Sequence, residues 1–551
     1  MRPMIGRLRK GEWVLLAQVA ALVVIASLWM GFSLDWRIQH DAPLLFYVAF
    51  LMERFDMVPY RDVFETSFPG VFVLHRLISA VFGYSDQGLA LFNALYFLAL
   101  SLISGFLLRP FGWRVALSGP AIFALIYFGH GQFMTLQRDY LAILPIALAL
   151  AFTVQRRWAI SADHRAFGMG VLFGLAASIK PQFGVGAFSA LAYLVLANPV
   201  QRGRWPGQLL RLAVLAMSGG LVVMIPLVLW LWLNDALEPF LDMATGYLPL
   251  HLALNGEHQL LTAAARWNYY VDSIMALGGY GWLLPVASLG VWLCWRVFAH
   301  HEQRNLLMLL VSVAGLHFTL PIIAGQFWDY HWMPFAWSLS GLVGMALVAD
   351  RRPARNSAHD LLVAVIVSWV LWFGAAPGWE LKARLHGWPL TPPLFGRVDE
   401  IGAFLEKELQ PGDTVQPLDW TSGAIHAMLE AKARLATRFL YDYHFYHQVD
   451  SPYIQTLRNT FLGELQRACP RFVIEVHDER HPKDFPGAPR FESLQKWLTS
   501  NYAVRSQADE YLVWERRDVQ ACGVQTSDGR TRSGSPTLRM SSSNGVELRA
   551  L

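Results

Sequence analysis

The chain has 551 residues, of which 54% are hydrophobic and only 16% are charged. Soluble globular proteins carry roughly 25% charged residues, so the composition argues against an ordinary cytosolic enzyme. A formal net charge of +4 along the whole chain makes no basic face, which excludes a nucleic-acid binder. The three cysteines lie far apart and have no metal-type spacing: Cys294, Cys469 and Cys522.

The charged residues are distributed unevenly. Residues 1–379 contain 43 of them, and the 172 residues that follow contain another 43. We therefore expect a transmembrane domain over 1–379 and a soluble domain over 380–518. The final stretch, 519–551, is rich in Ser, Gly, Thr and Arg, and its composition predicts a disordered tail.

The first two thirds contain many apolar runs of membrane type. A helix needs about 20 apolar residues to cross a bilayer. Eleven runs are candidates, some of them short: 13–33, 88–108, 115–129, 140–155, 166–180, 182–198, 212–233, 274–295, 306–324, 334–349 and 361–379. The first resembles the start of a signal peptide, but no small-residue cleavage site follows, so we interpret it as a retained helix.

The positions of Lys and Arg predict the orientation. With a cytoplasmic N-terminus, the inside segments carry 17 of these residues and the outside segments between helices carry 7. Eleven spans then place the C-terminal domain outside. We expect a multi-pass protein of the cell inner membrane, with long outer loops at 34–87 and 234–273. The first outer loop contains an amphipathic stretch, 43–55, and an apolar piece, 71–82, that is too short to span. Both are expected to lie along the interface.

The last third alternates helical and strand-like patterns. Helical spacing covers 397–409, 421–432, 453–467 and 490–500, and strand-like runs cover 414–418, 472–476, 502–505 and 511–515. This alternation predicts a small extracytoplasmic α/β domain. Because it contains no phosphate-binding glycine loop, nucleophile elbow or zinc signature, it offers no catalytic argument.

Four ionisable residues fall at the outer ends of predicted helices: Asp41, Asp139, Lys180 and His331. Charge at membrane depth is costly, so each is a functional candidate. Each also has a structural interpretation: a solvated loop acid, a helix-start ion pair with Arg138, a lysine that reaches the headgroups, and a loop histidine. Lys180 is the only lysine between residues 11 and 379.

This combination favours one kind of chemistry. A carboxylate can deprotonate an acceptor hydroxyl while cations stabilise a departing phosphate. Together, two carboxylates, a lysine and an imidazole at the outer face indicate transfer from an anionic, lipid-borne donor. No Rossmann-like domain is predicted on the inside, where a nucleotide-sugar donor would be found.

Several short motifs occur in the order typical of one superfamily. They are Asp41 after the first helix, Val58-Pro59-Tyr60-Arg61-Asp62, Phe68-Pro69-Gly70, Phe82-Gly83-Tyr84-Ser85, Arg138-Asp139, the run from Gly174 to Pro181, and Tyr330-His331 followed by Pro334. In this order the chain, over most of 13–345, resembles the GT-C superfamily of polytopic glycosyltransferases. The resemblance is to the bacterial protein-mannosyltransferase-like and aminoarabinose-transferase-like families, which use polyprenyl-phosphate sugars.

The resemblance implies a hexosyl- or pentosyltransferase with specific roles for these residues. Asp41 would be the general base and Asp139 the second carboxylate. The lipid phosphate would be bound by residues among Lys180, Arg61, Arg138 and His331, and further candidates are Asp35, His40 and Tyr330. The partners implied are a polyprenyl-phosphate-sugar donor, the bilayer, and an acceptor that is a lipid, a polysaccharide or a protein.

The chain departs from the superfamily pattern at two places. Many relatives have Asp-Glu where this chain has Asp41-Ala42, and Pro-Pro where it has Pro69-Gly70. With one acid in place of two, we expect no metal site in this loop, so a divalent metal cofactor is doubtful. Asp35 is the alternative working acid.

Two other classes of function remain as alternatives. A transporter or flippase for a lipid-linked or anionic substrate would use the same charges to line a pathway. However, the sequence shows no internal repeat, and the charges lie at one face instead of the midplane. The second alternative is a non-catalytic envelope assembly factor, which should tolerate Asp41→Asn.

Overall fold

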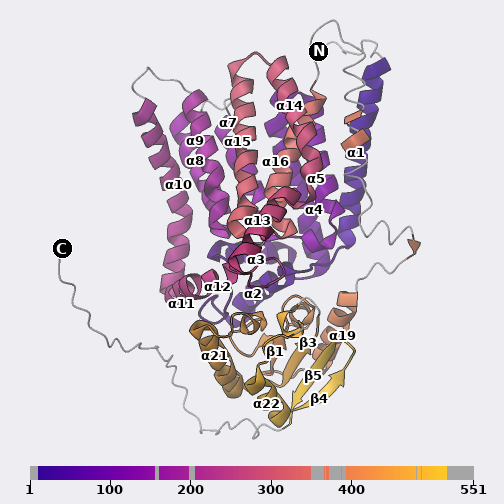
Figure 1. Ribbon diagram of the computed structural model, residues 1–551, viewed down its shortest axis with the longest axis vertical. Helices are drawn as coiled ribbons and strands as arrows, with labels where there is room; N and C mark the ends of the chain where they lie inside the picture. Colours follow the sequence, from indigo (N-terminus) through magenta and orange to yellow (C-terminus); the bar gives the residue numbers. More distant parts are fainter. Residues whose placement is uncertain are drawn as a thin grey trace, which may run out of the picture.

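The computed structural model describes residues 10–155, 160–197, 205–348, 393–478, 481–485 and 487–517, with a few short pieces between 365 and 387. A bundle of roughly parallel and antiparallel helices forms one half of the molecule, and a small α/β domain lies against one end of it (Figure 1). The predicted tail and most of the predicted span at 361–379 lie outside the described residues.

Helices are found within each of the first ten predicted spans. They are α1 (Lys10–Phe32), α4 (Asp86–Leu108), α5 (Trp113–Gly129), α7 (Ile143–Val154), α8 (Ala162–Ile179), α9 (Gly186–Ala197), α10 (Trp205–Leu233), α13 (Ala263–Ala276) leading into α14 (Leu284–Val297), α15 (His301–Ala324) and α16 (Met333–Gly344). The break between α8 and α9 falls at Lys180-Pro181, because the residue before a proline is driven out of the helical region.

Fewer of these helices can cross a bilayer than the sequence predicted. Within the described ranges, four are long and apolar enough, namely Leu16–Asp35, Asp86–Phe111, Trp205–Leu233 and His301–Ala324. A fifth is obtained if the pair Ala263–Gly279 and Gly281–Val297, bent by 59°, counts as one span. The protein is thus a helical membrane protein, but the described residues do not confirm eleven spans.

The short helices have a physical explanation. α7 has 12 residues, which is about 18 Å of helix against a hydrocarbon core of about 30 Å. Most of its side chains are buried inside the protein, whereas the apolar side chains of α10 are largely exposed. Hydropathy alone does not distinguish an apolar helix packed in protein from one that faces lipid.

The loops predicted for one side of the membrane gather at one end of the bundle. The rings of Phe111 and Phe298, from two predicted inside loops, lie 5.6 Å apart. At the opposite end, the first long loop contacts the α/β domain, where Tyr47 Oη donates to the carbonyl oxygen of Ala433 at 2.9 Å. These described parts of the loops therefore lie at opposite ends of the bundle (Figure 1).

Short helices separate the bundle from the α/β domain. They are α2 (Asp41–Phe55), α3 (Pro69–Phe82), α6 (Arg138–Leu141), α11 (Leu237–Asp242) and α12 (Leu248–Leu252). α3 exposes Leu77 and Val81, as expected of a helix along the interface. For α2 that expectation was wrong, because Asp41 through Leu51 are all buried. The α/β domain packs against α2 instead, where Tyr47 contacts Ala433.

The last described part of the chain, 393–517, contains helices and a small sheet. It consists of α19 (Pro393–Glu408), β1 (Thr414–Leu418), α20 (Ala424–Glu430), β2 (Arg434–Leu435), α21 (Pro452–Ala468), β3 (Phe472–Val476), α22 (Glu492–Asn501), β4 (Tyr502–Gln507) and β5 (Tyr511–Arg516). The strand order is β2-β1-β3-β5-β4. β2, β1 and β3 are parallel, and β5 and β4 add an antiparallel hairpin. The two-residue strand β2 is too short for a sequence pattern to predict.

Arg37 joins the first loop to this domain. Its guanidinium contacts Asp86 at 2.6 Å, Asp399 of α19 at 2.7 Å and Glu430 of α20 at 2.7 Å. It also lies over the ring of Phe395, 4.7 Å from the centroid. These contacts hold the α/β domain against the segment that leads into α2.

Candidate active site

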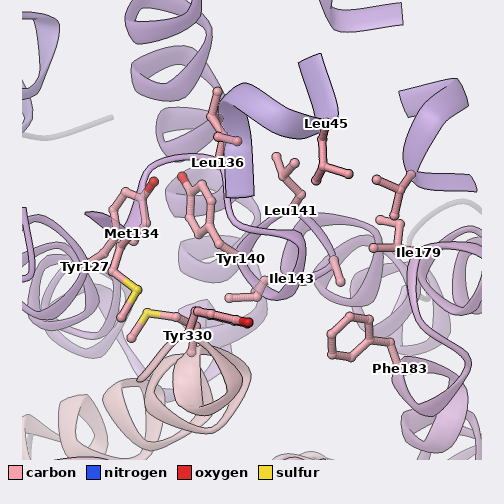
Figure 2. Packing of buried hydrophobic residues seen from close by; sticks show 14 of the residues in the cluster. Leu45, Tyr127, Met134, Leu136, Tyr140, Leu141, Ile143, Ile179, Phe183 and Tyr330 are labelled. Carbon is pink, nitrogen blue, oxygen red and sulfur yellow. The ribbon is translucent and has the colours of Figure 1, made fainter. Parts of the chain in front are cut away.

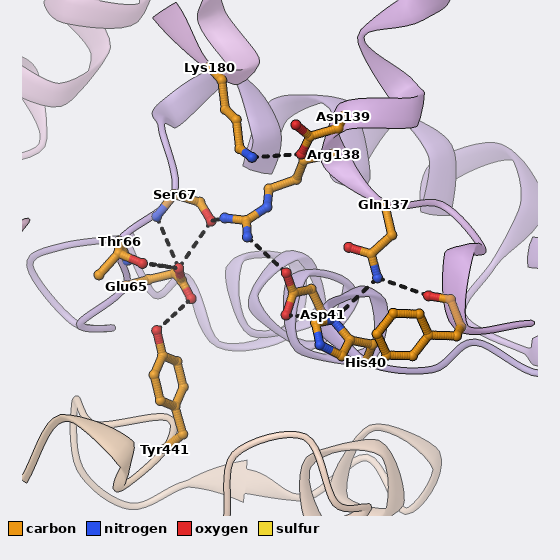
Figure 3. A network of polar contacts seen from close by, with 11 residues as sticks. His40, Asp41, Glu65, Thr66, Ser67, Gln137, Arg138, Asp139, Lys180 and Tyr441 are labelled. Carbon is orange, nitrogen blue, oxygen red and sulfur yellow. Dashed lines mark hydrogen bonds and ion pairs between the residues drawn. The ribbon is translucent and has the colours of Figure 1, made fainter. Parts of the chain in front are cut away.

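Four charged residues from three segments meet below the bundle (Figure 3). Arg138 Nη2 donates to Asp41 Oδ2 at 2.8 Å, and Lys180 Nζ donates to Asp139 Oδ2 at 2.6 Å. Because Arg138 and Asp139 are consecutive, the two ion pairs lie side by side. We call Asp41, Arg138, Asp139 and Lys180 the charge cluster.

Local backbone geometry directs these side chains inward. Asp41 is the first residue of α2, where the helix dipole favours a carboxylate. The residue before it, His40, has φ 61° and ψ −123°, a conformation that costs a residue with a Cβ about 1–3 kcal/mol. His40 Nδ1 lies 3.1 Å from Asp41 Oδ1. The strained residue thus contacts the candidate base directly.

The charge cluster is withdrawn from solvent. The side chains of Asp139 and Lys180 are 2% and 14% exposed, and those of Asp41 and Arg138 are 11% and 15% exposed. Burial by itself would raise the pKa of Asp41, but His40 and Arg138 outweigh it and hold that pKa well below its usual range. Asp41 is therefore ionised at neutral pH, which pairing with a cation permits in a buried position.

A third buried acid, Glu65, extends this network, and no pattern in the sequence predicts it. Arg138 Nη1 donates to Ser67 Oγ at 2.7 Å, and Ser67 Oγ donates to Glu65 Oε1 at 3.0 Å. Tyr441 of the α/β domain donates from Oη to Glu65 Oε2 at 3.4 Å. Burial raises the pKa of Glu65. The α/β domain thus reaches the charge cluster through Tyr441, Glu65 and Ser67.

Tyr330 and His331 lie against the same cluster. The ring of Tyr330 is 5.5 Å from Lys180 Nζ and 5.7 Å from the ring of His40, and Figure 2 shows it packed among buried apolar residues. His331 Nδ1 is buried and has no hydrogen-bond partner within the described parts of the chain. Burial, together with Lys180 and Arg138, lowers the pKa of His331 well below its ordinary value. It is therefore a neutral imidazole, which can form hydrogen bonds but carries no positive charge.

Two sequence candidates lie apart from the charge cluster. Arg61 pairs with Asp62 at 2.7 Å and donates to the carbonyl oxygen of Asn234 at 3.0 Å. Asp35 is exposed, in the 3-10 turn Ser33–Asp35 that follows α1, whereas Asp41 and Asp139 are buried. Its exposure favours Asp41 over Asp35 as the working acid.

One grouping of side chains has the spacing of a metal site. Within the described residues, ligand atoms of Asp86, His426 and Glu430 lie within 4.8 Å of one another. However, the guanidinium of Arg37 already binds Asp86 and Glu430. An arginine thus supplies the positive charge that these carboxylates need, and this grouping is better explained as part of the domain contact.

Gly70 allows α3 to approach the end of α8 closely. A Cβ at this position would collide with the side chain of Ser178, two residues before Lys180. We expect Gly70→Val to displace Lys180, to cost about 1–3 kcal/mol of stability and to reduce activity. Gly315→Val is the matched control, because nothing lies within 4 Å of a Cβ there. Thermal stability and activity of the two purified variants provide the test, and equal behaviour would contradict this role for Gly70.

Comparison with known proteins identifies the fold. No family model and no curated protein matches the chain. Among solved structures, ArnT from Cupriavidus metallidurans bound to undecaprenyl phosphate matches with a TM-score of 0.56 at 14% identity, over 94% of this chain and 100% of that one. The apo form of the same protein matches with a TM-score of 0.55 at 14% identity, over 93% and 99%. The archaeal oligosaccharyltransferase AglB from Archaeoglobus fulgidus matches at 0.45 and 12% identity, over 91% and 74%.

The chain therefore has the fold of a GT-C membrane glycosyltransferase. In particular, it has the fold of ArnT along nearly the whole length of both chains. The resemblance seen in the order of the sequence motifs is confirmed at the level of the fold.

Proposed function

We propose that this protein is an integral-membrane glycosyltransferase that moves a hexosyl or pentosyl group from a polyprenyl-phosphate donor to a cell-envelope acceptor. The observation that carries the proposal is the buried charge cluster at one end of a fold shared with ArnT, a protein solved with undecaprenyl phosphate bound. The cluster offers both a carboxylate and cations, which is what such a transfer needs.

In this proposal Arg138 and Lys180 bind the donor phosphate. Both cations are already neutralised, Arg138 by Asp41 and Lys180 by Asp139. An arriving phosphate must therefore share these cations with the two carboxylates. Arg138 suits this role because its second terminal nitrogen is held by Ser67, which fixes the plane of the guanidinium. Tyr330 closes the cluster on one side, and His331 supplies a neutral hydrogen-bonding group.

Donor binding would then activate the base. The pKa of Asp41 is low because His40 and Arg138 favour the carboxylate, and so deeply depressed a carboxylate is a weak base. A phosphate bound to Arg138 weakens that pairing and raises the pKa of Asp41. Asp41 then takes the proton of the acceptor hydroxyl, while the oxygen of that hydroxyl attacks the anomeric carbon of the donor sugar. The bond from that carbon to the phosphate oxygen breaks, and Arg138 and Lys180 stabilise the polyprenyl phosphate that leaves.

The orientation and domain boundaries belong to the same proposal. We propose that the membrane domain covers 1–379 and that the domain covering 380–518 is extracytoplasmic, like the cluster it contacts. Reporter fusions at residues 205, 300 and 353 should indicate the cytoplasm, and one at 450 the outside, because the predicted inside loops carry most of the Lys and Arg residues. A cytoplasmic signal at 450 would overturn both the orientation and the catalytic face.

Lipid analysis of a deletion strain tests the function itself. We expect a polyprenyl-phosphate sugar to accumulate, together with an envelope glycan that lacks this sugar. Reintroducing the wild-type gene should reverse both effects, whereas Asp41→Asn should reverse neither. Accumulation of a nucleotide sugar without a lipid-linked species would contradict the donor, and full reversal by Asp41→Asn would favour a transporter or scaffold.

A further inference from the structure

A wide cleft lies between the first outer loop and the α/β domain, apart from the charge cluster. Its volume is about 590 Å³. The loop contributes Phe55 to Met57, Arg61 and Asp62, and the domain contributes Ala436 and residues around it from β2 and α21. By comparison, the crevice beside His40 and Trp420 has room for only about 10 Å³. The cleft is thus large enough for a headgroup-sized ligand.

Four arginines line the cleft, and two of them have no carboxylate partner among the described residues. The four are Arg61, Arg434, Arg438 and Arg467, and the acids in the same lining are Asp56, Asp62 and Glu464. Arg61 pairs with Asp62 and Arg438 pairs with Glu464, at 2.7 and 2.6 Å.

The other two guanidinium groups face the cleft without an ion pair. Arg434 lies over the ring of Phe55, 5.4 Å from its centroid. Arg467 donates only to the carbonyl oxygen of Gly463 in its own helix, at 3.2 Å. Asp56, the third acid of the lining, is exposed. The cleft therefore offers two charged, planar donors that suit the oxygens of a phosphate.

The cleft lies beside the end of an exposed apolar helix, α10. Arg61 binds the carbonyl oxygen of Asn234, which directly follows α10. The last residues of that helix, Trp232 and Leu233, are 62% and 66% exposed, as expected of a lipid-facing surface with an aromatic residue at its boundary. An arginine of the cleft therefore contacts the chain where the apolar surface ends, which is where lipid phosphates lie.

We infer that this cleft is a second phosphate-binding site, separate from the charge cluster, for a phosphate group carried at headgroup level. Arg434 and Arg467 bind the phosphate, and the paired Arg61 and Arg438 flank it. The ligand is either an anionic phospholipid or the phosphate of a larger membrane-anchored glycan. This inference does not depend on the proposed transferase activity.

Binding of dioctanoyl phosphatidic acid to the purified full-length protein in detergent tests the site. We expect Arg434→Gln with Arg467→Gln to weaken binding at least about 10-fold, because two charge-assisted contacts are removed. Arg490→Gln is the matched control, an exposed arginine of the same domain outside the cleft, and should leave binding unchanged. Binding to the wild type should also weaken as salt is raised.

The same assay tests whether the phosphate binds in the cleft or at the charge cluster, and which kind of molecule carries it. Loss of binding in the Asp139→Asn and Lys180→Gln double variant, but not in the arginine variant, would place the phosphate at the charge cluster and overturn the inference. Undiminished binding in the arginine variant would overturn it as well. With glucose 1-phosphate as the second probe, tighter binding of the lipid supports a membrane phospholipid, and equal binding supports a glycan phosphate at the same arginines.

Discussion

Asp41→Asn is expected to lower sugar transfer by on the order of 10²–10⁴-fold, which is the usual contribution of a positioned general base. The amide has the shape of the carboxylate and can still accept a hydrogen bond from Arg138. The charge of Arg138 stays compensated by the nearby carboxylates of Glu65 and Asp139, so the fold should survive. It cannot take a proton from the acceptor hydroxyl. The measurement is transfer from the lipid-linked donor in isolated membranes, with the amount of folded protein determined in the same samples.

Asp35→Asn is the matched control for this substitution. Asp35 precedes Asp41 by six residues in the same loop but is exposed in the 3-10 turn after α1. We expect it to retain full activity. If Asp41→Asn keeps full activity and Asp35→Asn loses activity, Asp35 is the catalytic base and Asp41 is not.

The pH dependence should differ between the free and the donor-bound protein. In the free protein, His40 and Arg138 hold the pKa of Asp41 below its usual range, so this group stays ionised as the pH falls from 7 to about 5. The acid limb that Asp41 causes in the pH profile of kcat/KM should therefore lie below about pH 5. Donor phosphate bound to Arg138 raises the pKa of Asp41, so the acid limb of kcat should move to higher pH. Limbs at the same pH in both profiles would contradict activation by the donor.

Lys180→Ala is expected to remove most of the folded protein. Lys180 and Asp139 form a buried pair with a separation of 2.6 Å, and deleting one partner leaves an uncompensated buried charge, which costs about 3–5 kcal/mol. Loss of activity in this variant alone would not distinguish a structural lysine from one that binds phosphate. The expected result is a large drop in expression and thermal stability, measured by fluorescence-detected size-exclusion chromatography.

The double variant Asp139→Asn with Lys180→Gln separates the two roles. Both buried charges are then removed together, which is often tolerated, so the protein should fold. Donor use should still fall about 10- to 100-fold, because one charge-assisted contact to phosphate is worth roughly 1.5–3 kcal/mol. The single variant Lys180→Arg keeps the positive charge but should have only part of the wild-type activity, because a planar guanidinium group replaces a compact ammonium group. A double variant with wild-type donor use would show that Lys180 does not bind the donor.

Much of the architecture could be predicted from local patterns. Apolar runs located the bundle helices. The orientation that follows from the distribution of Lys and Arg stays a prediction. Alternating helix and strand signals predicted the α/β domain. The number of membrane spans could not be predicted from hydropathy. A short helix such as α7 is buried inside the protein, yet it is as apolar as a helix that faces lipid.

The candidate site was predicted only in part. Asp41, Asp139 and Lys180 were identified because charge is rare at helix ends in a membrane protein, and the structure brings them together. Arg61 is a candidate for the same phosphate, and in the structure it pairs with Asp62 and donates to the carbonyl oxygen of Asn234. Glu65 was missed, since a single acid in a loop has no periodicity that reports burial.

The sequence by itself determined the membrane character of this protein, the positions of its helices and the charged residues at their ends, because hydropathy and periodicity act within a few residues. Only the tertiary structure decided which charges pair. Arg138 reaches Asp41 across 97 residues of sequence, and Tyr441 reaches Glu65 across 376. Such pairs form because buried charges and polar groups must find partners, and the fold alone determines which partners are within reach.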